Sequence, residues 1–150
     1  MTSDVAVSEK NHKTGWAHFE HLADIGIRGY APTKAQAFEQ AALALTAVIT
    51  EPKGVKSELR VDITCDAPDD ELLLVEWLSK LLYEMDVQDM LFSRFSVTIE
   101  GNILRAEAWG EKLDVSKHDP VVEVKAATYS ALKVRKDDEG IWTAQCVVDV

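Results

Sequence analysis

The stretch that decides the fold is HLADIGI, residues 21–27, in which Asp24 stands between small and apolar neighbours. The preceding residues, WAHFEH (16–21), alternate in polarity, and the residues after Asp24 alternate again, with Ile25 and Ile27 on one face. This pattern predicts one bent β-strand or two short strands. Burying a carboxylate without a partner would cost several kcal/mol, so the stretch raises the question of what neutralises Asp24.

The composition favours one folded domain with a substantial core. The chain has 150 residues, 47% of them hydrophobic, and its formal net charge is −10. An acidic surface repels phosphates, so we expect no tight independent binding to nucleic acid, and a basic partner or a divalent cation suits it better. The longest apolar run, residues 72–75, is far too short for a membrane span, and the first residues lack the apolar segment of a secretory signal. We therefore expect a cytoplasmic protein without a membrane anchor.

Local signals place two helices among several strands. Residues 1–13 are polar and aperiodic, which predicts a flexible tail before a domain spanning 14–150. Thr33 and Gln36 have the spacing of a capping box at the start of a helix that should end before Pro52. Asp66 or Asp69 can cap a second helix. Alternating runs predict the strands, which cover residues 14–31, 55–65, 95–100, 103–109, 121–135 and 141–150, with a polar loop at 110–120.

These elements predict an α+β fold in a single domain. Because most of the strands come in adjacent, hairpin-like pairs, we expect a mostly antiparallel (mixed) β-sheet of about seven strands. The apolar stripes of the two helices are one-sided, so both helices should pack on one face of that sheet.

No familiar catalytic motif is present in the sequence. G-x-S-x-G, Walker A, G-x-G-x-x-G and H-E-x-x-H patterns are all missing, so we expect no catalytic residues. Cys65 and Cys146 stand in apolar strand patterns outside any C-x-x-C, which indicates buried free thiols rather than a disulfide or a zinc site.

Carboxylates offer the strongest chemical signal, at the two ends of the domain. The sequence closes with CVVDV (146–150), so Asp149 comes directly before Val150. If the strand of Asp24 lay beside this last strand, the clustered anions would favour a hard divalent cation with oxygen ligands. Taken alone, the pattern also fits a turn-capping Asp24 and a solvated Asp149. Lys125, in VVEVKAATY (121–129), falls opposite the apolar face of Val122 and Val124, as either a solvated or a functional amine.

Several motifs in order resemble one protein family. HLADIGIRGYAPTKAQAFEQAALAL (21–45) is similar to the opening of archease proteins, and the resemblance continues through EWLSKLLYEMD (76–86), AWGEKLD (108–114) and KHDPVVEVKAATYSALKV (117–134). It ends with the penultimate aspartate and covers residues from about 14 to 150.

The resemblance implies a function and a set of site residues. Archeases are accessory proteins of the GTP-dependent tRNA-splicing RNA ligase, so this chain would promote guanylylation of the ligase and its multiple turnover. The family's metal site, usually described as calcium, would fall on Asp24, Asp149 and Val150. Its functional lysine would be Lys125, and we expect His21 of the opening motif to assist in activating the partner. The alternatives are a stand-alone metal-dependent phosphoesterase and a general protein chaperone.

Overall fold

The computed structural model describes residues 13–150, and the predicted flexible tail lies almost wholly outside the described residues. The elements follow the chain in an order that mixes strands and helices. They are β1 (Gly15–His21), β2 (Asp24–Ala31), α2 (Lys34–Ile49), η1 (Pro52–Gly54), β3 (Leu59–Asp66), α3 (Asp70–Gln88), β4 (Met90–Glu100), β5 (Ile103–Lys112), α4 (Val115–His118), β6 (Ala126–Ala127), β7 (Lys133–Lys136) and β8 (Trp142–Asp149).

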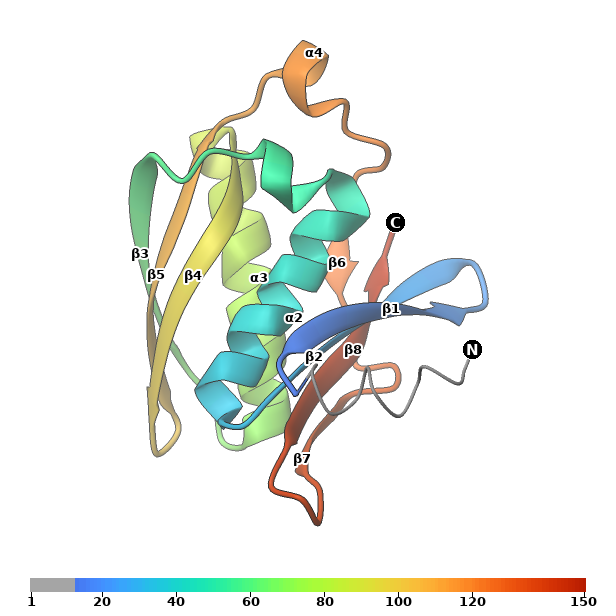
Figure 1. Ribbon diagram of the computed structural model, residues 1–150, viewed down its shortest axis with the longest axis vertical. Helices are drawn as coiled ribbons and strands as arrows, with labels where there is room; N and C mark the ends of the chain where they lie inside the picture. The colour runs from blue at the N-terminus through green and yellow to red at the C-terminus, as the bar shows by residue number, and fades with distance from the viewer. Residues whose placement is uncertain (1–12) are drawn as a thin grey trace.

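The α+β class and the antiparallel pairing are confirmed, and one feature of the predicted sheet is corrected. Within residues 13–150 the strands form two sheets rather than one. The five-stranded sheet has the order β1-β2-β8-β6, with β7 also pairing β8, and the three-stranded sheet has the order β3-β5-β4. Each strand pair is antiparallel. The long helices α2 and α3 lie between the two sheets and cover the inner face of both (Figure 1).

The two long helices start where the sequence predicted. The Thr33 hydroxyl accepts a hydrogen bond from the Gln36 N–H at 3.1 Å, and the Asp69 carboxylate accepts one from the Leu72 N–H at 2.8 Å. Each bond satisfies a backbone donor that the first helical turn leaves without a partner. Asp69, rather than Asp66, is therefore the cap of α3.

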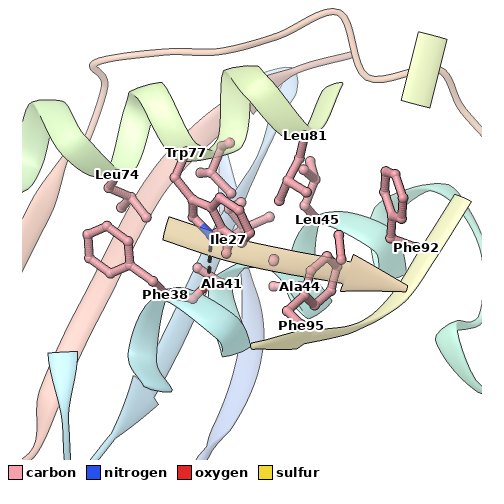
Figure 2. Packing of buried hydrophobic residues seen from close by; sticks show 14 of the residues in the cluster. Ile27, Phe38, Ala41, Ala44, Leu45, Leu74, Trp77, Leu81, Phe92 and Phe95 are labelled. Atoms are coloured by element: carbon pink, nitrogen blue, oxygen red, sulfur yellow. Dashed lines mark hydrogen bonds between the residues drawn. The ribbon is translucent and has the colours of Figure 1, made fainter. Parts of the chain in front are cut away.

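The core fills the space between the sheets, and two of its buried side chains form hydrogen bonds across it. Figure 2 shows Trp77 of α3 against Phe38 of α2, with the indole N–H donating to the Phe38 carbonyl at 3.0 Å. The buried Thr46 hydroxyl donates to the Phe92 carbonyl at 2.7 Å and links α2 to β4. These bonds remove the penalty that the buried polar groups would otherwise impose.

One glycine lets α2 approach the five-stranded sheet closely. A Cβ atom at Gly29 would stand 2.3 Å from both the Ala37 carbonyl oxygen and the Ala41 nitrogen. Because those atoms are helix backbone, only a residue without a side chain permits this packing distance. In the described part of the chain, no helix is both long and apolar enough to cross a membrane.

Candidate functional site

Strand register brings the first and last motifs together. The stretch HLADIGI forms the turn of the β1–β2 hairpin, in which His21 lies opposite Asp24. β2 pairs β8 with Ile25 opposite Val148, so the next step of the same register sets Asp24 opposite Asp149. Ala126 of β6 lies on the other side of Asp149. Because directly opposite residues share a face, His21, Asp24, Asp149 and Ala126 form one row across the sheet.

This row lies on the outer face of the five-stranded sheet. Val148 is fully buried in the core between the sheets, and Ile25 packs against that core. Since successive strand residues alternate in direction, the side chains of Asp24 and Asp149 lie on the face away from the helices. Asp149 is exposed and Asp24 is half-buried. The two carboxylates are thus adjacent and open to a ligand.

Backbone contacts complete the arrangement at the end of β8. The Val150 N–H donates to an Asp24 carboxylate oxygen at 3.5 Å, and the Lys125 N–H donates to the Asp149 carbonyl at 2.7 Å. The three residues expected at the metal site, and Lys125, therefore converge on one end of the sheet. The pairing of β2 with β8 meets the condition on which the predicted cation site depended, whereas the position of Lys125 beside Asp149 was not predicted from the sequence. The metal itself remains a prediction.

The row carries two like charges without a neutralising side chain among residues 13–150, because no ion pair there involves Asp24 or Asp149. Like charges directly opposite one another destabilise a strand pair. The described residues hold no group of three or more histidine, cysteine or acidic side chains suited to a metal ion. A cation there would need oxygens beyond the two aspartates, which backbone carbonyls and water can supply. Such an all-oxygen set suits calcium or magnesium.

Lys125 does not lie in a strand of the predicted length. Residues 119–125 run without regular structure, and β6 contains only two residues, so the expected strand over 121–135 is corrected to a loop and two short strands. Of the apolar positions expected to share a buried face, Val124 is buried but Val122 is 37% exposed. The Lys125 side chain is exposed, which leaves its amine free to reach a partner.

The hairpin turn beside the row has a strained backbone. Leu22 adopts a φ of 55°, a region that costs an ordinary residue roughly 1–2 kcal/mol, and its side chain is 96% exposed. Local strain of this kind concentrates near functional sites. The turn therefore presents an apolar side chain next to the paired carboxylates.

Sequence reasoning missed a second cluster on the same face. The Phe19 ring covers Gly26, the Arg28 guanidinium lies 4.8 Å from the centre of that ring, and its Nε donates to the Gln145 side chain at 2.8 Å. Gln145 in turn donates to the Ala131 carbonyl at 3.1 Å. These contacts fix the face that bears the carboxylates. Phe19 and Gln145 are 126 positions apart in the sequence, so only the strand register could have revealed that they belong to one cluster.

The polar loop predicted at 110–120 is also more ordered than expected. β5 extends to Lys112, and α4 follows it. The buried His118 ring accepts a bond from the Asp114 N–H and contacts the Glu111 carboxylate at 2.9 Å. Hydrogen bonds from Lys117, the Lys56 backbone and His118 lower the pKa of Glu111 to about 2. This network anchors the segment that leads to Lys125.

Both cysteines are buried and free, as predicted. Burial raises the pKa of the Cys65 thiol to about 11 and that of Cys146 to about 12. Thiols of such high pKa are poor nucleophiles at neutral pH. Neither residue is a candidate for catalysis.

A model of the archease protein family (MTH1598/TM1083) matches residues 16–150. The chain belongs to the archease family. It is 45% identical to protein archease of Pyrococcus furiosus over 139 residues, which cover 90% of this chain and 98% of that protein. It is 38% identical to protein archease of Methanosarcina barkeri over 143 residues, which cover 90% of this chain and 95% of that protein.

Solved structures agree with the archease assignment. The solution structure of Methanobacterium thermoautotrophicum protein 1598 matches with a TM-score of 0.79 and 31% identity, over 91% of this chain and 99% of that one. A crystal structure from Thermotoga maritima, described as an archease and possible chaperone, matches with a TM-score of 0.56 and 19% identity, over 88% of this chain and 94% of that one. The second likeness supports the archease fold alone.

Proposed function

We propose that this archease-family protein activates a GTP-dependent tRNA-splicing RNA ligase, promoting guanylylation of the ligase and its multiple turnover. Membership of the archease family over residues 16–150 supports the proposal. The observation that carries it is the row in which Asp24 and Asp149 lie opposite one another on an open sheet face. Such a row gives a protein without a catalytic motif a means of presenting charge to a partner.

The site residues of the proposal are Asp24, Asp149 and Val150, holding a divalent metal ion that we expect to be calcium. The two aspartates repel each other unless a cation neutralises them. Oxygen donors alone make up the set, as hard cations require. When bound, the ion would supply positive charge next to a partner's triphosphate or its metal ligands.

Two further residues would act on the ligase directly. The exposed Lys125 amine can place a positive charge against a phosphate oxygen, since its backbone is held to Asp149 while its side chain is open to solvent. His21 is in the same row as Asp24 and can donate or accept a hydrogen bond at the docked surface. Phosphoryl-type transfer depends on this kind of charge neutralisation and positioning.

The partner, in this proposal, is the ligase protein rather than RNA. A net charge of −10 disfavours tight independent binding to nucleic acid, and it favours encounter with an enzyme whose RNA-binding groove is basic. We place the activity in the cytoplasm, where the ligase would meet its RNA substrates.

Single-turnover guanylylation tests the proposal. Purified ligase, labelled GTP and this protein are mixed with and without calcium, and transfer of the label to the ligase is followed in time. We expect Asp24→Ala and Asp149→Ala to reduce the rate to that of ligase alone, and Lys125→Ala to lower it in part. Asp138→Ala, which removes an exposed turn carboxylate, is the matched control and should activate normally.

The outcome also separates the alternatives. Unchanged rates for both aspartate variants would reject the proposed mechanism. Metal-dependent cleavage of phosphate esters by this protein without ligase would indicate the phosphoesterase. Suppression of aggregation of unrelated clients, unaffected by the aspartate variants, would indicate the chaperone.

A further inference from the structure

An apolar groove opens at the end of the molecule where both long helices finish. Its volume is about 440 Å³, within the range of roughly 300–1,000 Å³ typical of binding clefts. The end of α2, the end of α3, the start of β4 and the loop before β6 form its walls. Apolar side chains line most of it, chiefly Leu82, Met85, Leu113, Val121, Val122 and Val124.

The walls of this groove are held in place by backbone hydrogen bonds. The Val121 N–H donates to the Ile49 carbonyl at 2.9 Å, and the Leu113 N–H donates to the Asp89 carbonyl at 2.9 Å. Val121 nevertheless leaves 71% of its side chain exposed. A fixed groove with an exposed apolar rim is typical of a surface that binds another molecule.

Negative charge surrounds the groove. Asp86, Asp89 and Glu123 line it, all three are exposed, and none forms an ion pair within residues 13–150. Neither α2 nor α3 has a basic residue in its last turn, so the partial negative charge of both helix ends is largely uncompensated. Lys112, which donates to the Gln88 carbonyl, offsets only part of the charge at the end of α3.

One wall of the groove leads along the chain to a proposed activating residue. The loop that forms one wall, residues 120–124, leads directly to Lys125, whose N–H is bonded to Asp149. Figure 1 shows this loop descending from α4 to β6, near the C-terminus. A segment seated in the groove would therefore contact the loop that precedes Lys125.

We propose that this groove binds the RNA ligase through an apolar side chain flanked by lysine or arginine. This inference rests on the proposed function and specifies the docking surface that it requires. The apolar lining would take the anchoring side chain, and the three carboxylates and two helix ends would attract the flanking cations. A neutral or acidic segment would leave those carboxylates unpaired and would bind weakly.

Binding of purified ligase by calorimetry, with guanylylation at saturating protein as a second readout, tests the groove. Val121→Asp puts a charge on the apolar rim, and we expect it to weaken binding by about tenfold or more while the saturated rate stays near wild type. Val115→Asp is the matched control, because Val115 is 66% exposed in α4 but does not line the groove. Glu123→Gln with Asp86→Asn should weaken binding and make it less sensitive to salt.

Hydrogen exchange in the complex gives a measurement that needs no variant. We expect slower exchange at residues 120–124 and 85–89 when ligase binds. Equal affinity of Val121→Asp and wild type, or unchanged exchange in both segments, would overturn the groove proposal while leaving the activator role intact. A wild-type protein that neither binds nor activates the ligase would overturn both the activator role and the groove proposal. An Asp24→Ala variant that binds the ligase normally but does not activate it would support the groove as the docking surface.

Discussion

Replacing Asp149 with asparagine should have opposite effects on stability with and without metal. The Asp149 carboxylate lies opposite that of Asp24 and has no cationic partner in the described part of the chain. Two unit charges about 5 Å apart repel by about 0.8 kcal/mol in water, and cross-strand pairs of this kind contribute roughly 0.2–1 kcal/mol. In a chelator, Asp149→Asn should therefore raise the melting temperature by about 1–3 °C.

In calcium, wild type should instead melt at a higher temperature than Asp149→Asn. A ligand at 100 times its dissociation constant stabilises the folded state by about 2.7 kcal/mol, which for a chain of this size is about 5–11 °C. Wild type should gain that shift, and Asp149→Asn should gain little of it because the donor set has lost a carboxylate.

Differential scanning fluorimetry in a chelator and across a calcium titration measures both effects. Asp138→Asn changes the net charge by the same amount at an exposed turn and should keep the wild-type calcium response. A wild-type melting temperature that no divalent cation changes, or an Asp149→Asn variant that melts lower in the chelator, would refute the reasoning.

Three further predictions concern stability and reactivity. Gly29→Ala should destabilise the fold by about 3 kcal/mol or more in urea unfolding, because its Cβ would stand 2.3 Å from the backbone of α2. The pKa of Glu111 is lowered to about 2, so its contribution to the free energy of unfolding is present above pH 4.5 and is lost as the pH falls toward about 2. Glu111→Gln should therefore make the free energy of unfolding depend less on pH in that range. Cys65 and Cys146 should react with a thiol reagent at neutral pH only as fast as the protein unfolds, and rapid labelling of the native state would contradict their burial.

Local signals in the sequence were sufficient to place the two long helices. Thr33 and Asp69 each cap a helix through a bond to a backbone N–H within three residues, so the information lies in adjacent positions. The sheet arrangement depends on distant pairs instead. β8 inserts between β2 and β6, and β5 separates β3 from β4, which alternation within single strands cannot specify.

The segment from Glu111 to Lys125 shows a different reason for failure. Its residues are mostly polar and so resemble a loop, yet His118 is 5% exposed. The ring is buried because Glu111 and the Asp114 N–H satisfy its two nitrogens, and the Thr50 hydroxyl donates to its carbonyl. Burial here follows from tertiary hydrogen bonds that composition does not reveal.

Strand parity explains why the fold brings the two aspartates of the candidate site together, although the sequence pattern alone also fitted a turn cap and a solvated residue. Ile25 and Val148 lie opposite one another on the face that packs against the helices, so Asp24 and Asp149 must share the other face. A slip of one residue in the β2–β8 register would expose Val148 and separate the two carboxylates at the same time. The apolar residues that stabilise the core therefore also keep the two carboxylates adjacent. A bound cation would remove the repulsion between them and so would stabilise the fold. The family resemblance identified the two aspartates as site candidates. The packing of the neighbouring Ile25 and Val148 explains why they cannot move apart.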